Sequence, residues 1–206
     1  MKKILKTLIA LVVAALHLTP SCAQGNPKKG ENMNETKKVL VAFFSRTGEN
    51  YAVGHIEKGN THIIAEMIAE ERGGTLFRIE PAAPYPDNYK KCIEMAKQEL
   101  NAKARPAIQG DIDIEEYDTV FIGYPNWWAD MPMPVYTFVE KHDWMGKTVI
   151  PFCTHEGSGL SGTEAKLKSA CKGATVLSGL AVRGATAQNK REQAKQSVTN
   201  WIKKLK

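Results

Sequence analysis

Short apolar runs alternate with segments of helical periodicity from residue 38 to the end of the chain. An unbroken apolar run of four to eight residues is typical of a strand that is covered on both faces. Between these runs, apolar residues recur every three or four positions, which predicts helices. The predicted strands are 39–44, 75–79, 118–124, 148–153 and 174–182, and the predicted helices are 61–72, 89–102, 135–142, 163–171 and 190–205.

Regular alternation of strand and helix predicts an α/β domain. Right-handed crossovers then give a mostly parallel sheet with helices on both faces. In such sheets, ligands bind at the carboxyl ends of the strands, where the strand order reverses. Pro151 lies inside the predicted strand 148–153 and removes one hydrogen-bond donor from it, so we expect that strand to be least regular toward its end.

The first 22 residues have the layout of a secretory signal peptide. Lys2, Lys3 and Lys6 precede an apolar run over 8–16, which is too short to span a bilayer as a helix. The sequence therefore predicts export. An uncleaved anchor is the less favoured interpretation.

Two processing sites fit this segment. Residues 18–22 resemble a bacterial lipobox, with Cys22 as the lipid-bearing residue, whereas Ala23 fits cleavage after small residues. The lipobox is favoured and predicts a membrane-anchored lipoprotein that faces the periplasm, while simple cleavage would give a soluble periplasmic protein. Residues 23–37 are polar and predict a flexible tether, which leaves 38–206 as the folded domain.

Charge and cysteine content narrow the function only a little. The chain has 28 Lys plus Arg and 22 Asp plus Glu, a formal net charge of +6, and three of the lysines belong to the signal segment. Both signs are interleaved, so no nucleic-acid partner is predicted. Cys92, Cys153 and Cys171 are odd in number and lack C-x-x-C spacing, so neither a disulfide framework nor a metal site is predicted.

The first predicted strand ends in a hydroxyl-rich loop, and a second polar turn opens the next helix. Hydroxyls and free N–H groups at a helix N-terminus favour a phosphate or another anion. An ordinary turn with Thr61 as the N-cap is the structural alternative. A Walker A pattern at 54–61 has Asn60 where lysine is required, which disfavours a nucleotide triphosphatase. The candidate residues are Ser45, Arg46, Thr47, Gly48, Asn60 and Thr61.

The third predicted strand is followed by a loop of proline and aromatic residues. Such a loop could clamp a flat apolar ring and meet its polar edge with backbone groups. Packing under a neighbouring loop is the alternative for at least one of the two tryptophans. The candidate residues are Pro125, Asn126, Trp127 and Trp128.

The fourth predicted strand leads into a glycine-rich loop, which lets the backbone approach a ligand closely. His155 beside Glu156 would suit acid–base chemistry, but a solvated loop histidine is the favoured interpretation. The serine in this loop lacks the spacing of a nucleophile elbow, so a hydrolase is disfavoured. The candidate ligand-binding residues are Thr154, Gly157, Ser158 and Gly159.

Together these motifs resemble the flavodoxin-like FMN proteins, in particular a bacterial branch with FSRTG, GNT, GYPxWW and PFxTxxGSG in this order. The resemblance extends from Lys38 to the C-terminus. It implies a doubly wound, five-stranded parallel sheet with the strand order 2-1-3-4-5 known for flavodoxin. It also implies that Ser45, Thr47, Asn60 and Thr61 hold the FMN phosphate, while Arg46 adds charge or points to solvent. Residues 125–128 would flank the flavin ring, with Thr154 and residues 157–159 on its other side.

The sequence departs from this family pattern at two places. Residues 49–58 interrupt the phosphate loop, which is contiguous in the usual flavodoxin. Ala129 stands where many flavodoxins have a glycine whose peptide turns over beside the flavin. Because a side chain at positive φ costs about 1–2 kcal/mol, the alanine favours two-electron over one-electron transfer.

Three classes of function remain open. The leading one is an FMN-binding redox protein, which either exchanges electrons with a partner protein or reduces a quinone or similar small acceptor with NAD(P)H. The tryptophan-rich loop favours small planar substrates. A cofactor-free binding module on the same fold is the second class, and a hydrolase is the third. The apolar face of the C-terminal helix is expected to cover the sheet rather than rest on lipid, and the oligomeric state is not predicted.

Overall fold

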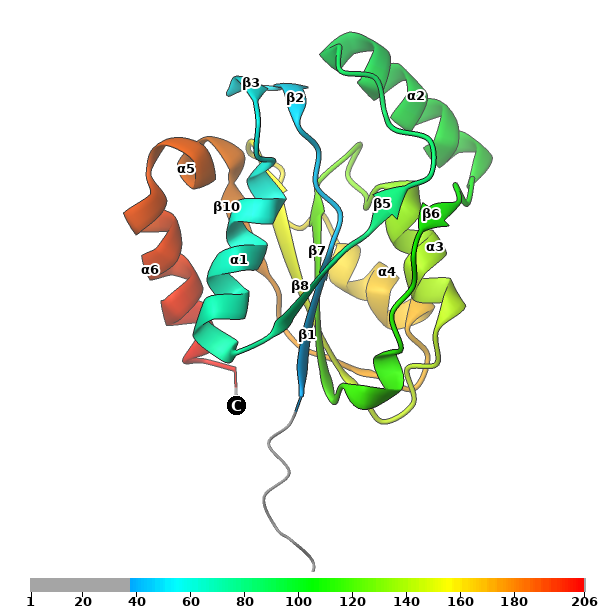
Figure 1. Ribbon diagram of the computed structural model, residues 1–206, viewed down its shortest axis with the longest axis vertical. Coiled ribbons are helices and arrows are strands. Elements are labelled where there is room, and N and C mark those ends of the chain that lie inside the picture. The colour runs from blue at the N-terminus through cyan, green and yellow to red at the C-terminus, as the bar shows by residue number, and fades with distance from the viewer. Residues whose placement is uncertain (1–37, 206) are drawn as a thin grey trace, which may run out of the picture. The chain divides into compact units, whose positions relative to one another are not determined.

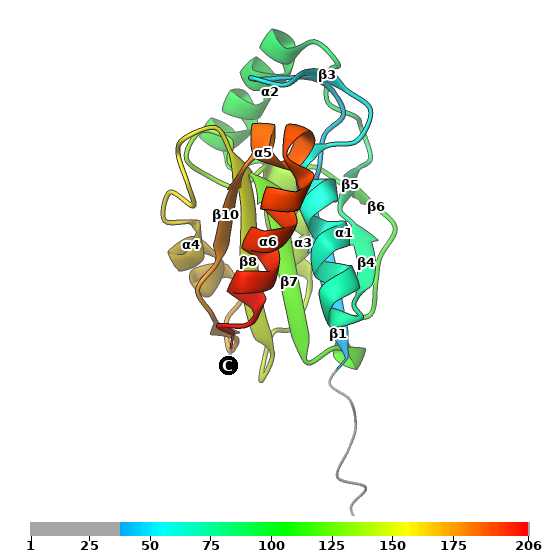
Figure 2. The same cartoon turned by 90° about the vertical axis from the view of Figure 1, so that its left-hand side faces the viewer.

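The computed structural model describes residues 38–205. The predicted signal peptide with Cys22 and the predicted tether lie outside the described residues. Within them, a parallel sheet is covered by helices on both faces, which confirms the predicted α/β class (Figures 1 and 2). No helix in this range is both long enough and apolar enough to cross a bilayer.

The sheet runs in the order β10-β8-β7-β1-β4, and all its strand pairs are parallel. With the strands counted in chain order, and with β9 and β10 taken as one predicted strand, this is the order 2-1-3-4-5 that the family resemblance implied. The strands are β1 (Val39–Phe43), β4 (Thr75–Arg78), β7 (Thr119–Pro125), β8 (Thr148–His155), β9 (Thr175–Val176) and β10 (Leu180–Arg183).

The helices lie on both faces of the sheet (Figure 2). On the first face lie α1 (Asn60–Arg72), α5 (Gly184–Asn189) and α6 (Arg191–Ile202). On the second lie α3 (Met133–Lys141) and α4 (Thr163–Ala170). Helix α2 (Tyr89–Ala102) lies beyond the carboxyl end of the sheet, beside the inserted hairpin (Figure 1).

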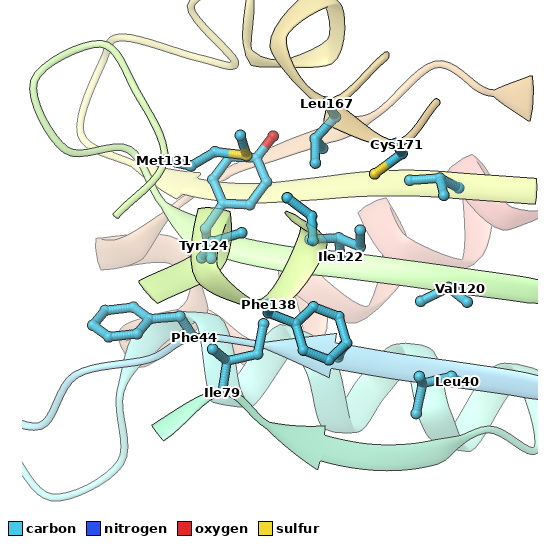
Figure 3. Close-up of a cluster of buried hydrophobic side chains, with 14 of the residues drawn as sticks. Leu40, Phe44, Ile79, Val120, Ile122, Tyr124, Met131, Phe138, Leu167 and Cys171 are labelled. Atoms are coloured by element: carbon cyan, nitrogen blue, oxygen red, sulfur yellow. The ribbon is translucent and has the colours of Figure 1, made fainter. Parts of the chain in front are cut away.

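A separate apolar cluster fills each face of the sheet. On the α3–α4 face, Tyr124 and Ile122 of β7 pack with Phe138 and Leu167 of the helices (Figure 3). On the other face, Trp201 of α6 lies edge-on to Phe121, with ring centroids 5.7 Å apart. The apolar side of α6 therefore covers the sheet, as predicted. Because the central strands are buried on both faces, their sequences read as unbroken apolar runs.

The predicted strand 174–182 is wrong in one respect, because it is broken into β9 and β10. The amide of Leu177 donates to the carbonyl of Val149. Val149 and the other odd-numbered residues of β8 therefore direct their N–H and C=O groups toward β9 and β10. The next of them is Pro151, which has no N–H to offer. One extra residue is accommodated opposite it, since Val176 pairs with Val149 but Leu180 pairs with Phe152. The predicted irregularity at Pro151 thus falls on the neighbouring strand, and β8 itself continues to His155.

Several short elements were not predicted from the sequence. The inserted segment forms a hairpin of β2 (Gly48–Asn50) and β3 (Gly54–Ile56). A second antiparallel pair joins β5 (Glu80–Pro81) to β6 (Ile108–Gln109), and a 3-10 turn, η1, spans Ile114–Glu116. These segments are too short for hydrophobic periodicity to show.

Several helix boundaries also differ from the prediction, most of all at α3 and at the C-terminal helix. Helix α3 begins at Met133 rather than at 135, because Pro134 is compatible with the first turn of a helix. The predicted helix 190–205 is preceded by the separate six-residue helix α5, with the break at Lys190.

Candidate functional site

A pocket of about 410 Å³ lies where β7 and β8 end and α1 begins. The sequence analysis had singled out many of its lining residues, because the ends of parallel strands meet at one edge of the sheet. Of the predicted candidates, the pocket wall includes Asn60, Pro125, Asn126, Trp127, Trp128, Thr154, Gly157 and Ser158.

The structure does not bring all the candidates into this pocket. Ser45, Arg46 and Thr47 line a separate cavity of about 60 Å³ next to Arg78. Neither cavity wall includes Gly48, Thr61 or Gly159. The predicted phosphate residues that line a cavity are therefore spread over two different cavities.

The start of α1 lies directly against the loop that follows β1. Gly59 is its N-cap residue, so the alternative in which Thr61 caps the helix is wrong. A Cβ at Gly59 would come 2.2 Å from Ser45 Oγ, so only glycine allows this approach. Ser45 Oγ accepts a hydrogen bond from the amide of His62 at 3.0 Å. The two preceding amides, of Asn60 and Thr61, have no acceptor within the helix.

Buried hydroxyls join α1 to the end of β8. Thr61 Oγ1 and Thr154 Oγ1 lie 2.7 Å apart, and both side chains are buried. Next to them, Gln188 Nε2 donates to Asn60 Oδ1 at 2.9 Å, which leaves the Asn60 amide nitrogen as a donor. The helix start thus carries oriented N–H groups and a positive dipole end, which favour an anion.

The Arg46 side chain does not point to solvent, so that alternative is wrong. One terminal nitrogen contacts the carbonyl of Glu49, and the other donates to the carbonyls of Pro86 and Asp87 at 2.6 and 2.5 Å. Arg46 Nε is buried without a hydrogen-bond partner within the described part of the chain. The guanidinium therefore fastens the inserted hairpin to the segment that leads into α2.

The aromatic loop contains a tight turn over residues 127–130. The backbones of Trp127 and Asp130 exchange both hydrogen bonds, at 2.9 and 3.0 Å. The two central residues have positive φ, 56° at Trp128 and 58° at Ala129, which is the pattern of a type I′ turn. Lys166 Nζ donates to the carbonyl of Ala129 at 3.1 Å and pairs with Asp130 at 2.7 Å. The turn is therefore held by a half-exposed lysine and a buried carboxylate.

The two adjacent tryptophans have different environments. Trp127 lies edge-on to Phe44 and Tyr85, with ring centroids 5.3 and 5.0 Å away, so packing under a neighbouring loop accounts for it. Trp128 is 48% exposed. Its indole N–H donates to the carbonyl of Ile93 in α2 at 3.1 Å, and Lys97 Nζ lies 4.7 Å from its ring centroid. Trp128 is thus fixed against α2, remains about half exposed and lines the pocket.

Asn126 connects the second loop to the third. Its backbone amide donates to the carbonyl of Thr154 at 2.8 Å, and its side-chain amide donates to the carbonyl of Gly159 and to Ser161 Oγ. Gly157 has φ +137°, and nothing lies within 4 Å of a Cβ built there. The backbone of the third loop is therefore open to close contact with a ligand.

His155 and Glu156 do not form an acid–base pair. His155 Nδ1 accepts a hydrogen bond from the amide of Gly157 at 2.8 Å, and Glu156 Oε1 accepts one from Ala185 at the start of α5 at 2.7 Å. Burial and the nearby Arg183 lower the pKa of His155. Both side chains therefore shape the loop, although they also line the pocket.

The sequence analysis missed the residues that the insertion and α2 bring to the pocket. These are Asn50, Tyr51, Tyr89, Ile93 and Ala96. The spacing of Tyr89, Ile93 and Ala96 places them on one face of a helix, and this was the only signal available. Nothing in the sequence showed that the hairpin folds back onto that face.

The donor set fits a ligand with an anionic end and a flat ring. Amide donors and the helix start lie at one part of the wall, while aromatic rings and open backbone lie at others. The volume falls in the range of small-molecule and cofactor sites. Within residues 38–205, no group of three His, Cys, Asp or Glu side chains could hold a metal ion.

Comparison with known proteins agrees with the observed fold. The family model described as Flavodoxin matches residues 38–205. A crystal structure from Bacteroides uniformis, described as a flavoprotein, is 35% identical, with TM-score 0.65, over 82% of this chain and 99% of that one. A similarly described structure from Bacteroides eggerthii is 32% identical, with TM-score 0.64, over 81% and 96%. A flavoprotein from Lactobacillus acidophilus, solved in complex with FMN, is 23% identical, with TM-score 0.55, over 75% and 97%. No protein of curated function matches.

Proposed function

The chain belongs to the flavodoxin family, and from this premise we propose that it binds FMN and transfers electrons through it. The observation that carries the proposal is the pocket at the ends of β7 and β8, which combines Asn60 at the start of α1 with aromatic rings. A related fold solved with FMN supports the choice of flavin. Bound FMN would supply reversible acceptance of one or two electrons at the flavin ring.

The residues of the pocket divide the work of binding. Asn60 and the first-turn amides of α1 would hold the phosphate, aided by the helix dipole. The open backbone at 157–158 and the 125–128 loop would flank the ring, and Trp127, fixed by Phe44 and Tyr85, would give that loop a rigid base. Arg46 acts at a distance, because it fastens the hairpin rather than reaching the pocket.

Two kinds of electron donor and two kinds of acceptor are compatible with this proposal. NAD(P)H or a reduced partner protein would supply electrons, and a partner protein or a small planar acceptor would remove them. The exposed ring of Trp128 favours the small acceptor, because aromatic surface at a pocket wall suits stacking.

We also propose that the protein is exported and anchored by a lipid on Cys22, with the flavin domain facing the periplasm. The support is the charged, then apolar, start of the chain and its lipobox-like end. Fractionation of cells that express the full chain tests this, because cleavage without lipid would place the protein in the soluble fraction.

Replacement of Asn60 tests the assignment of the phosphate. Asn60→Ala removes an amide that would donate to the phosphate, and a hydrogen bond to a charged group contributes about 1.5–3 kcal/mol. We expect FMN to bind at least about tenfold more weakly and riboflavin, which lacks the phosphate, to bind as before. Flavin fluorescence during titration of the apoprotein measures both affinities.

Asn200→Ala, on the outer part of α6, is the matched control and should change neither affinity. Equal loss of FMN and riboflavin affinity in Asn60→Ala would move the phosphate elsewhere. A wild-type chain that is colourless and binds neither flavin would favour the cofactor-free binding module.

A further inference from the structure

We propose that the inserted hairpin and α2 form a subsite for a planar quinone, lined by Tyr51, Tyr89 and Trp128. This inference rests on the proposed function, because it assigns the substrate of the same pocket. Of these three residues, only Trp128 belongs to a segment that was predicted to bind the flavin.

Aromatic side chains are unusually open at this part of the pocket. Tyr51 is 64% exposed and Trp128 is 48% exposed, although both line the pocket. The rings of Tyr51 and Tyr89 are stacked, with centroids 6.1 Å apart and planes at 28°. Exposed aromatic surface that gathers in a concave site marks a place where a ligand covers it.

The hairpin is fastened in place and does not hang free. The amide of Glu49 donates to the carbonyl of Asp87 at 3.1 Å, and Glu49 Oε2 accepts from the amide of Tyr89 at 2.9 Å and from Asn88 Nδ2 at 3.0 Å. Arg46 adds its bonds to the carbonyls on both sides of this junction. Figures 1 and 2 show the hairpin and α2 together beyond the carboxyl end of the sheet. Tyr51 is therefore presented by a preorganised element, which lowers the entropic cost of binding.

Trp128 belongs to the same wall. Its indole N–H is bonded to Ile93 of α2, so the ring is oriented by the helix that carries Tyr89. The ammonium of Lys97 lies near this ring. The rings of Tyr51, Tyr89 and Trp128 and the charge of Lys97 thus come from the hairpin, α2 and the aromatic loop, which contact each other. The amides suited to phosphate come from a different element, α1.

This chemistry selects a flat ring that carries carbonyl oxygens. The rings of Tyr51 and Trp128 offer stacking surface, and the phenol O–H of Tyr89 can donate to a quinone oxygen. Burial raises the pKa of Tyr89, so the phenol stays protonated and acts as a hydrogen-bond donor to the quinone oxygen. The quinone takes up two electrons and two protons and leaves as the hydroquinone. NAD(P)H as reductant would supply the two electrons and the first proton, as a hydride equivalent passed on through the bound flavin, and the second proton would come from solvent. Lys97 favours negative charge on the oxygen while it is being reduced.

Reoxidation of the dithionite-reduced, FMN-loaded full chain by menadione tests the subsite without needing the natural donor. In Tyr51→Ala, we expect the menadione concentration for half-maximal rate to rise by about 3- to 10-fold, the size of one lost aromatic contact. The FMN affinity and the rate with ferricyanide, which is not a flat ring, should stay unchanged. Tyr51→Phe should keep the stacking and lie close to wild type.

Met145→Ala, an exposed apolar residue in the loop before β8, is the control and should behave as wild type. A loss of FMN affinity in Tyr51→Ala, equal slowing of both acceptors, or an unchanged menadione dependence would each overturn the subsite. These results are distinct from failure of the proposed function, which would appear in the wild-type chain as absence of flavin binding.

Discussion

Ala129 has a backbone conformation that usually belongs to glycine. The sequence analysis assumed that a side chain at this position disfavours positive φ and so favours two-electron transfer. In the structure Ala129 already has φ 58°, within a turn held by Lys166 and Asp130. The folded protein therefore already includes the energetic cost of positive φ at Ala129. This residue consequently gives no support to a preference for two-electron transfer. A strained residue can persist where its surroundings over-determine it.

Glycine at this position should stabilise the fold. Ala129→Gly removes a Cβ from a left-handed residue, so we expect the free energy of unfolding to rise by about 0.5–1 kcal/mol. Ala52 also has a positive φ, 64°, so Ala52→Gly should raise the free energy of unfolding as well. Urea denaturation at a fixed flavin concentration measures the change.

Ala69→Gly in α1 is the opposite control and should lower stability by about 1 kcal/mol, because glycine is unfavourable inside a helix. If Ala129→Gly also destabilised the protein, the left-handed turn would not be the source of strain.

Among the elements, the insertion changes the site most. It separates the two halves of the phosphate motif along the chain, and Thr47 and Asn60 line different cavities. It also adds Asn50 and Tyr51 to the pocket wall and caps the start of α2 through Glu49. The insertion interrupts a motif in the sequence, but in the structure it connects the loop after β1 to the segment that leads into α2.

Removal of the Glu49 carboxylate should loosen α2. Its Oε2 accepts from the first helical amide, and loss of such a cap costs about 1 kcal/mol. In Glu49→Ala we expect faster amide hydrogen exchange in the first turn of α2 and a stability loss of this size. Glu49→Gln keeps an acceptor oxygen and should lose less.

Glu57→Ala is the control next to the same hairpin, because the Glu57 side chain is 93% exposed and its ion partner is the exposed His55. If exchange at α2 were equal in Glu49→Ala and wild type, Glu49 would not be part of the helix start.

For the molecule as a whole, partly buried histidines contribute to the response of stability to pH. The His142 side chain is 10% exposed, and its Nε2 lies 3.5 Å from Asp111 Oδ1. This Nε2 is buried and has no hydrogen-bond partner in the described part of the chain. Burial lowers the pKa of His142 from 6.5, against the opposing effect of Asp111. The pKa values of His62 and His155 are lowered as well, also mainly by burial.

Stability should therefore fall as the pH is lowered from 7.5 to 5. A histidine whose pKa is lower in the folded state binds its proton first in the unfolded chain, so its contribution is complete above pH 6.5 and is lost below it. We expect the urea midpoint to decrease over this range, with a smaller decrease in His142→Gln.

Burial raises the pKa of Glu99, so Glu99 makes stability rise as the pH falls. Both proteins contain Glu99, so the difference between their urea midpoints reports on His142. An equal slope in both proteins would show that His142 does not contribute.

The order of strands and helices could be predicted from the sequence, because the sheet is buried on both faces and the helices on one side only. The loops at the strand ends followed from the same pattern, since parallel strands bring their carboxyl ends together. Local chemistry was visible there as well, in Asn60 at a helix start and in Trp128 after a strand.

The tertiary structure alone decided which of these residues share a pocket. Hydrophobic periodicity does not show where a short polar insertion folds, so the hairpin, its bond to α2 through Glu49, and the place of Tyr51 were not predicted. The break opposite Pro151 has the same origin, because a missing N–H affects the neighbouring strand, which is distant in the sequence. The sequence determined the sheet through burial, which each residue type expresses locally, whereas the site depends on contacts between segments that only the folded chain brings together.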